Sequence, residues 1–146
     1  MRIISFLSFV IFLSICCSFR SVAQSSLSVT VSNLRNEKGH VLISLFKEGN
    51  GYPDEPENAF RKEKLRISNN KAAIVFSNLP AGEYAIAILH DENDDLKMNK
   101  TWLGLPREGY GFSNNVMGTF GPPSYSRAKF RHASGQNTVQ SIKTRY

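Results

Sequence analysis

The stretch Tyr84-Ala85-Ile86-Ala87-Ile88-Leu89 decides the fold of this 146-residue chain. Its tyrosine and both isoleucines share one parity, while both alanines and the leucine share the other. Alternate residues of a strand point to opposite faces of a sheet, so this segment is apolar on both faces. The pattern predicts a strand in the middle of a sheet. The small alanines would let another element pack closely on one side.

Short strands separated by turn residues precede this stretch. Asn78-Leu79-Pro80-Ala81-Gly82 predicts a turn, because proline presets φ and glycine supplies a left-handed position. Alternating or apolar segments predict strands over residues 27–32, 41–46, 62–68 and 72–76. We expect a hairpin over residues 33–39 and a tight turn at Asn69-Asn70. In the loop over residues 48–60 we expect a turn of helix that buries Phe60.

A long loop over residues 90–120 follows, and two more strands are expected after it. Residues 127–132 alternate strictly, with a basic stripe of Arg127, Lys129 and Arg131 on one face. Such a stripe favours a solvated or edge strand, and a polyanion-binding face is the alternative. Val139 and Ile142 fall on opposite parities, so we expect a bulge or burial on both sides of the last strand. The whole pattern predicts an all-β fold, a single antiparallel β-sandwich of about seven strands with essentially no other helix.

The first residues are typical of a secretion signal. Met1-Arg2 is positively charged, residues 3–17 are apolar or serine and too short for a transmembrane helix of about 20 residues, and Ser21-Val22-Ala23 suits signal peptidase. We therefore predict a cleaved signal helix over residues 1–23 and a β-sandwich domain over residues 24–146, periplasmic or secreted, with no transmembrane segment after cleavage. The alternatives are an uncleaved membrane anchor and a lipid anchor at Cys16 or Cys17.

Composition narrows the class further. Both cysteines lie in the expected signal, so the mature domain has no disulfide and depends on its core. The signal also holds two arginines and no acid, which lowers the net charge from +6 for the chain to +4 for the mature domain. A modest positive charge indicates an ordinary solvated surface. Nucleic acid is not an expected partner of an exported chain.

Three blocks of sequence suggest a family. They are Phe76-Ser77-Asn78-Leu79-Pro80-Ala81-Gly82-Glu83-Tyr84, then His90-Asp91-Glu92-Asn93, then Gly104-Leu105-Pro106-Arg107-Glu108-Gly109-Tyr110-Gly111-Phe112-Ser113-Asn114-Asn115. They closely resemble the bacterial secreted domain-of-unknown-function family 2141, and the similarity runs from about Leu27 to Tyr146. The resemblance implies export and an Ig-like or transthyretin-like β-sandwich related to carboxypeptidase regulatory-like domains. It implies no particular activity.

The chain departs from the family's pattern at two loop positions. Leu96 stands where the family usually has glycine, and Asn99 stands where it usually has aspartate, which weakens any inherited metal site. The transthyretin-like hydroxyisourate hydrolases, which share the implied fold, end in Tyr-Arg-Gly-Ser. This chain ends in Lys143-Thr144-Arg145-Tyr146, so that enzymatic interpretation loses its main support.

The loop offers one candidate metal site. Asp91, Asn93 and Asp95 have the alternate oxygen spacing that begins many calcium loops, and the Lys97 carbonyl and the Asn99 side chain could add ligands. An EF-hand is excluded, because its glycine and its bidentate glutamate are replaced by Leu96 and Trp102. The alternative is an Asx-rich turn whose side chains bond their own backbone. His90 is a second candidate ligand, alongside Asp91. A closed zinc site there would need further ligands, and folding would have to bring His40 and His132 close to supply them.

The search for catalytic residues is negative for the usual motifs. Asp91 and Glu108 could form an acid–base pair across the loop. Glu108 could equally form surface ion pairs with Arg107, Lys97 or Lys100. We therefore expect no catalytic residue and no enzyme.

The aromatic residues of the loop are the candidate ligand contacts. Trp102, Tyr110 and Phe112, with Phe120, could stack on a sugar or hold a peptide, or they could close one end of the sandwich as a plug. The working hypothesis is an exported, non-enzymatic envelope binding or accessory module. Its 90–120 loop would bind an unknown envelope protein, a peptide or a carbohydrate, with no cofactor other than the candidate calcium. The alternatives are a small periplasmic metal-dependent hydrolase using Asp91, His90 and Glu108, and a structural domain that joins an envelope assembly through a sheet edge.

Overall fold

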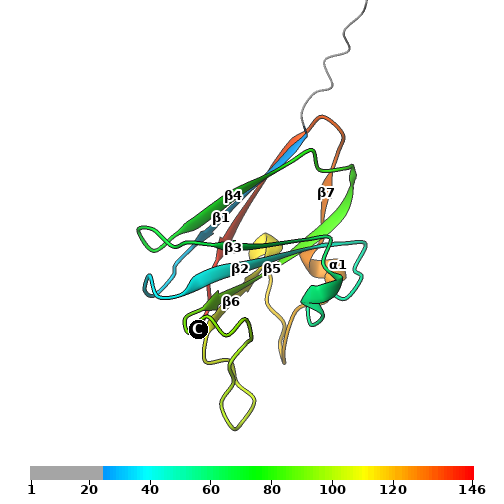
Figure 1. Ribbon diagram of the computed structural model, residues 1–146. Coiled ribbons are helices and arrows are strands. Elements are labelled where there is room, and N and C mark those ends of the chain that lie inside the picture. Colours follow the sequence, from blue (N-terminus) through cyan, green and yellow to red (C-terminus); the bar gives the residue numbers. More distant parts are fainter. Residues whose placement is uncertain (1–24) are drawn as a thin grey trace, which may run out of the picture.

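The computed structural model describes residues 25–146, which form two β-sheets and three short helical segments (Figure 1). The expected signal peptide and the two cysteines lie outside the described residues. The strands are β1 (Ser26–Ser32), β2 (His40–Lys47), β3 (Arg61–Leu65), β4 (Ala72–Ser77), β5 (Gly82–Asp91), β6 (Gly109–Phe112), β7 (Phe130–His132) and β8 (Asn137–Lys143). The helical segments are η1 (Pro56–Asn58), η2 (Ser113–Asn115) and α1 (Tyr125–Ala128).

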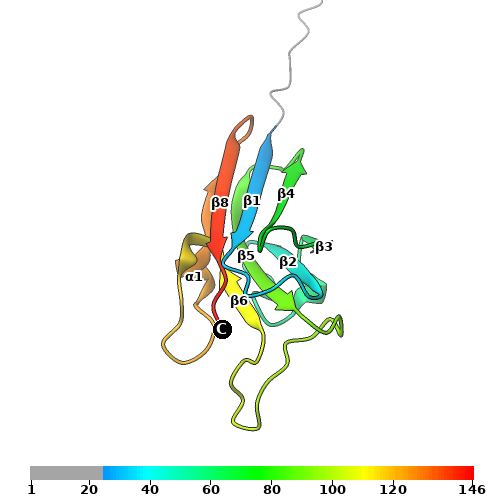
Figure 2. The ribbon, with the colours of Figure 1, turned by 90° about the vertical axis from the view of Figure 1, so that its left-hand side faces the viewer.

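One sheet has the order β4-β1-β8, and the other has the order β3-β2-β5-β6 with β7 also paired to β5. Most neighbours are antiparallel, as expected. The exception is β1, which pairs in parallel with β8 from Ser26↔Asn137 to Ser32↔Lys143. Figure 2 shows these two strands side by side and running in the same direction. The expectation of a purely antiparallel sandwich is therefore wrong at this pair.

A single apolar core lies between the two sheets. It combines the inward residues of β1 and β4 in one sheet with those of β2 and β5 in the other, which gives a β-sandwich-like arrangement. Burying one large aliphatic side chain stabilises a fold by about 1.5–3 kcal/mol. The fully buried members include Leu27, Val29, Val31, Val41, Ile43, Leu45, Tyr84, Ile86 and Ile142. Within residues 25–146 no helix is long and apolar enough to cross a membrane.

The predicted central position of β5 is confirmed. Ala85 and Ala87 lie on the face turned away from the main core, where Ala85 pairs with Phe46 and Ala87 with Phe112. Aromatic rings cover this face, because the Tyr52 ring centroid lies 5.4 Å from that of Phe46 and 6.2 Å from that of Phe112. Tyr52, from the loop before β3, thus packs with Phe46 of β2 and Phe112 of β6 on the face that the alanines leave open.

Two expected turns have different outcomes. Asn69 and Asn70 form the predicted tight turn, with φ angles of 53° and 57°, and Ser68 and Lys71 exchange backbone hydrogen bonds across it. The hairpin expected over residues 33–39 is wrong, because β1 and β2 belong to different sheets. The segment between them crosses from one sheet to the other. Phe60 is also not buried as expected, since it follows η1 and is 41% exposed.

The basic stripe predicted for residues 127–132 does not form one strand. Arg127 lies in α1, and β7 begins only at Phe130. The Ser113 hydroxyl and the Asn114 amide donate hydrogen bonds to the carbonyl of Ala128. These bonds take the place of the backbone hydrogen bond that a neighbouring strand would donate to this carbonyl. In β8 the register with β1 is continuous, Val139 is 67% exposed and Ile142 is buried, so neither the expected bulge nor burial on both sides occurs.

Candidate functional site

The loop between β5 and β6 projects from the end of the sheets (Figures 1 and 2). Two buried carboxylates hold its base. Asp91 ends β5 and accepts hydrogen bonds from the backbone N–H groups of Asp95 and Leu96, at 3.2 and 2.9 Å. Glu108 precedes β6 and accepts from the backbone N–H groups of Glu92 and Asn99, both at 3.0 Å. These bonds close the first half of the loop into a fixed turn.

Polar side chains form a second set of bonds within this turn. The Asp95 carboxylate accepts hydrogen bonds from the side-chain amides of Asn93 and Asn99, at 3.0 and 2.8 Å, and from the backbone N–H of Lys97 at 2.9 Å. The bonds from Asn99 and then Asn93 lower the pKa of Asp95 below its usual value. The structure thus brings the three predicted metal ligands, Asp91, Asn93 and Asp95, into one turn.

Their oxygens face N–H donors. Asp91 and Asp95 accept backbone hydrogen bonds in the manner of the Asx-rich turn that was the alternative to a calcium loop. Within residues 25–146 no cluster of three or more histidine, cysteine, aspartate or glutamate residues is placed to hold a metal ion. A calcium titration distinguishes the predicted calcium loop from this Asx-rich turn.

Two further ionic contacts attach the loop to the rest of the domain, and no sequence pattern indicated them. Glu92 forms an ion pair with Arg35 at 2.5 Å and accepts a hydrogen bond from Asn36 at 2.9 Å. Burial raises the pKa of Glu92, but the bonds from Asn36 and Arg35 outweigh burial and lower that pKa overall. Both partners of Glu92, Arg35 and Asn36, lie in the crossing segment between β1 and β2, for which the sequence predicted a hairpin.

Asp94 makes the second ionic contact. Its carboxylate lies 3.0 Å from the Lys64 amine and 2.6 Å from His40 Nδ1. The hydrogen bonds from Lys64 and then His40 lower the pKa of Asp94. In the sequence His40 is a candidate metal ligand that folding would bring to His90. In the structure His40 instead contacts the loop as a partner of the Asp94 carboxylate.

The buried His90 has both ring nitrogens occupied. Nε2 lies 2.9 Å from the Lys38 carbonyl and Nδ1 lies 2.6 Å from the Tyr146 hydroxyl. A carbonyl oxygen only accepts, so Nε2 donates, and Nδ1 shares the second hydrogen bond with the Tyr146 hydroxyl. The Tyr146 oxygen in turn accepts from the backbone N–H of Arg35 at 2.9 Å. This chain of bonds leaves His90 no free nitrogen for a metal or for a transferred proton.

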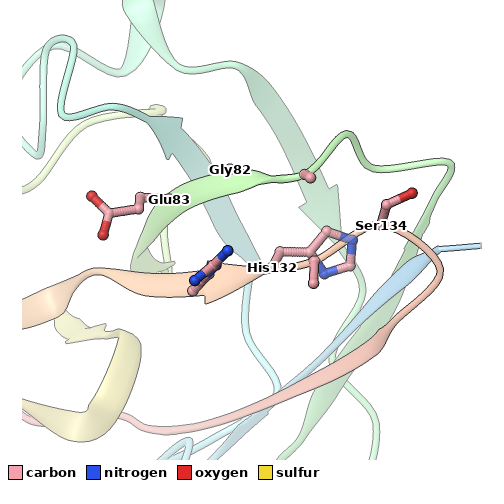
Figure 3. Close-up of a pocket in the computed structure, with 7 residues that line it drawn as sticks. Gly82, Glu83, His132 and Ser134 are labelled. Atoms are coloured by element: carbon pink, nitrogen blue, oxygen red, sulfur yellow. The ribbon is translucent and has the colours of Figure 1, made fainter.

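A shallow depression of about 460 Å³ lies at the paired ends of β5 and β7, beside His132 (Figure 3). His132 is buried, with Nδ1 2.7 Å from the Thr138 hydroxyl and Nε2 bonded to the Ser25 hydroxyl. That hydroxyl lies 2.6 Å from the Leu79 carbonyl and donates to it. Figure 3 shows the Glu83 carboxylate turned away from His132. The depression therefore has no convergent set of reactive groups.

A second depression, of about 430 Å³, lies at the base of the long loop. Its lining is entirely polar or charged, and the only two acids in it, Glu92 and Glu108, are already bonded to Arg35 and to backbone N–H groups. Glu108 is 4% exposed and does not form the surface ion pairs that its sequence neighbours suggested. The residues that line this second depression are Arg35, Glu92, Asn93, Asn99, Lys100, Arg107 and Glu108.

The structure separates the candidate ligand-binding aromatics. Phe112 is 6% exposed and Tyr110 is half-buried on β6, with their ring centroids 6.0 Å apart. Trp102 is 92% exposed at the far end of the loop, and Phe120 is fully exposed in the segment after η2. A plug made of all four rings is therefore wrong for Trp102 and Phe120. Only Tyr110 and Phe112 pack against the body of the domain.

The outer half of the loop is a small hairpin. Arg107 N–H donates to the Asn99 carbonyl at 2.9 Å, and Thr101 N–H donates to the Leu105 carbonyl at 2.8 Å. Gly104 N–H closes the turn on the Thr101 carbonyl at 2.9 Å, with φ of +79° at Gly104, a position that favours glycine. We call residues Thr101 to Leu105 the hairpin tip. It is an ordered turn, and Trp102 and Leu103 stand at its end.

Fold and site together define a small two-sheet β domain that carries one long, internally braced loop. The chain belongs to the family described as an uncharacterized protein conserved in bacteria (DUF2141), which matches residues 29–140. The match includes the whole loop and most of both sheets, and it confirms the resemblance seen in the sequence. Neither the curated proteins nor the solved structures gave a match.

Proposed function

We propose that the chain is an exported, non-enzymatic binding or accessory module of the bacterial envelope. Its scaffold would be an Ig-like or transthyretin-like sandwich, its first 23 residues a cleaved signal peptide, and its binding surface the 90–120 loop. The observation that supports this function is a group of exposed apolar side chains on a braced stem. Trp102, Leu103 and Leu105 of the hairpin tip are 92%, 62% and 60% exposed, and Leu96, in the turn at the base of the loop, is 61% exposed.

An exposed apolar group on an ordered loop favours a contact surface. Large exposed apolar side chains that lie together commonly mark interaction sites. The stem beneath them is held by Asp91 and Glu108, so little conformational freedom is left to lose when a partner binds. Unordered loops lose more entropy on binding, and the bracing of this stem therefore supports affinity.

The hydrolase alternative has less support. Its three residues would be His90, Asp91 and Glu108, and each of them bonds to backbone groups or to Tyr146. A general base must reach a substrate proton within hydrogen-bonding distance. These buried groups instead hold the loop to the sheets.

One observation favours the third alternative, a structural domain that joins an envelope assembly through a sheet edge. Val75 of β4 and Val139 of β8 are 57% and 67% exposed, and both pair in register with Ser28 of β1. With Ser28 between them, they form a short, partly apolar row on the outer face of the three-stranded sheet, on its two edge strands. This row is smaller than the hairpin tip and belongs to regular strands.

Site-specific photo-cross-linking in the native envelope tests the proposal. A benzophenone amino acid is placed at position 102 in one strain and at position 139 in another. The binding module predicts adducts at position 102 that are absent or much weaker at position 139. Adducts confined to position 139 would favour the structural alternative, and no adducts at position 102 would refute a binding role for the loop.

A further inference from the structure

We propose that the hairpin tip inserts into the surface of an anionic phospholipid bilayer. This inference rests on the proposed function, because it assigns a partner class to the same loop. Trp102 and Leu103 lie side by side at the end of the turn, and Leu105 follows them. Tryptophan prefers the interface between headgroups and acyl chains, where its apolar ring and its N–H group are both accommodated.

The backbone of the tip is suited to a medium poor in water. A polar backbone group that enters lipid needs a partner within the protein. Thr101 N–H bonds to Leu105, Gly104 N–H bonds to Thr101, and Leu105 N–H donates to the Thr101 hydroxyl at 3.1 Å. The carbonyls of Thr101 and Leu105 are the acceptors of the first two of these bonds. The turn therefore satisfies the backbone N–H groups of three of its five residues, Thr101, Gly104 and Leu105.

Basic residues stand directly below the apolar tip. Lys100 and Arg107 are exposed on the two arms of the hairpin, and neither forms an ion pair among the residues that the structure describes. Of the acidic residues in the loop, Glu92 pairs with Arg35, Asp94 pairs with Lys64, and Glu108 is buried. The exposed Asp95 carboxylate accepts hydrogen bonds from Asn93, Asn99 and the Lys97 N–H. In this arrangement the apolar side chains of the tip would contact the acyl chains, and Lys100 and Arg107 would lie at the level of the negatively charged headgroups.

The shape of the tip argues against a sugar or a peptide as the partner. Small ligands bind in concave sites with convergent polar groups. The tip is convex, and the polar depression nearest to it lies at the base of the loop, lined by Arg35 and Asn99 rather than by Trp102. Both views show the segment 116–124, which contains the fully exposed Phe120, projecting toward the same end of the sheets (Figures 1 and 2). Phe120 would then be a second, separate apolar contact.

The fluorescence of Trp102 provides a direct test, because it is the only tryptophan in the chain. The full chain is prepared with its natural N-terminus, identically for every variant, so any contribution of the first residues is common to all. Vesicles contain either phosphatidylcholine alone or equal parts of phosphatidylcholine and phosphatidylglycerol. The proposal predicts a blue shift of the tryptophan emission, and quenching by brominated acyl chains, with the phosphatidylglycerol vesicles.

Variants separate the apolar and the charged contributions. Leu103→Ser with Leu105→Ser should weaken vesicle binding on the order of ten-fold or more, because buried apolar area is lost. Lys100→Gln and Arg107→Gln should each weaken it roughly five-fold at low salt, and less at high salt. Val139→Ser and Lys71→Gln change exposed residues of the same kinds elsewhere and should leave binding unchanged. Equal melting temperatures among the variants would show that all of them fold.

Two results would overturn the proposal. One is an emission spectrum that the phosphatidylglycerol vesicles do not change. The other is vesicle binding that the two serine substitutions leave intact, which would place the contact outside the tip. If position 102 cross-links to a protein or a glycan while vesicles leave the emission unchanged, the membrane proposal fails and the binding module stands. If neither adducts nor a spectral change occur, both fail.

Discussion

Replacing Glu108 with glutamine should loosen the long loop and destabilise the domain. The side chain is 4% exposed, and its two carboxylate oxygens accept the backbone N–H groups of Glu92 and Asn99. Glutamine has nearly the same shape but only one acceptor oxygen. Its amide group must therefore turn one N–H toward a backbone N–H, and one of the two hydrogen bonds is lost.

The magnitude follows from the type of bond that is lost. A hydrogen bond to a charged group contributes about 1.5–3 kcal/mol, and an unsatisfied buried donor costs a similar amount. We expect Glu108→Gln to lower the free energy of unfolding by about 2–3 kcal/mol, or the melting temperature by roughly 10 °C for a domain of this size. A domain with a typical stability of about 5–15 kcal/mol would still fold.

Thermal and urea denaturation measure this loss, and amide hydrogen exchange locates it. The amides of Glu92 and Asn99 should exchange faster in the variant, because they lose their acceptor. Glu83→Gln is the matched control, since Glu83 also has a full set of contacts, to Lys129 at 2.9 and 3.0 Å, but its side chain is 51% exposed. We expect this control to lose less than about 1 kcal/mol. Equal losses in the two variants would refute the bracing role of Glu108.

Three further predictions concern the same loop. Leu96→Gly should stabilise the domain by about 0.5–1 kcal/mol, because Leu96 has φ of +64°, where a side chain is strained; a lower melting temperature would contradict this. Glu92→Gln should destabilise the domain at neutral pH. The folded pKa of Glu92 is lowered from 4.5, so its contribution is present above that pH and is lost as the pH falls through the folded value; denaturation curves in acid should converge. Millimolar calcium should leave the melting temperature unchanged, since the oxygens of Asp91 and Asp95 already accept N–H groups; a rise of several degrees that Asp95→Asn abolishes would instead establish a calcium site.

The strands were predictable where periodicity reports burial. The alternation of residues 27–32 and the two-sided apolar character of residues 84–89 gave the positions of β1 and β5 and the central place of β5. Parity shows which side of a strand is buried, but it does not show which strand lies beside it. The parallel partner of β1 and the crossing of the segment 33–39 between sheets therefore had no signal in the local pattern.

Residues 127–132 show a second limit of periodicity. Their strict alternation fits a strand, yet the chain forms α1 and only then a three-residue strand. The side chains of Ser113 and Asn114, which bond to the carbonyl of Ala128, help to set this conformation. No pattern within residues 127–132 could reveal partners that lie so far back in the chain.

The composition of the loop indicated an Asx-rich turn, and the structure has one around Asp91 and Asp95. The role of Glu108 was hidden, because its partners are backbone groups that no side-chain pattern marks. The contact of Arg35 with Glu92 was equally hidden, since it depends on the way the segment between β1 and β2 crosses the sheets. The glycine usual in the family at position 96 was the one informative departure, and Leu96 does adopt the left-handed conformation.

The parallel ladder between β1 and β8 has a consequence for the timing of folding. Its residues are about 111 positions apart, as for Ser26 and Asn137, so the three-stranded sheet cannot close until nearly all of the chain has been synthesised. Contacts between such distant segments form slowly. For the exported chain proposed above, this delay would keep the first strand without its partner until the last strand has been made.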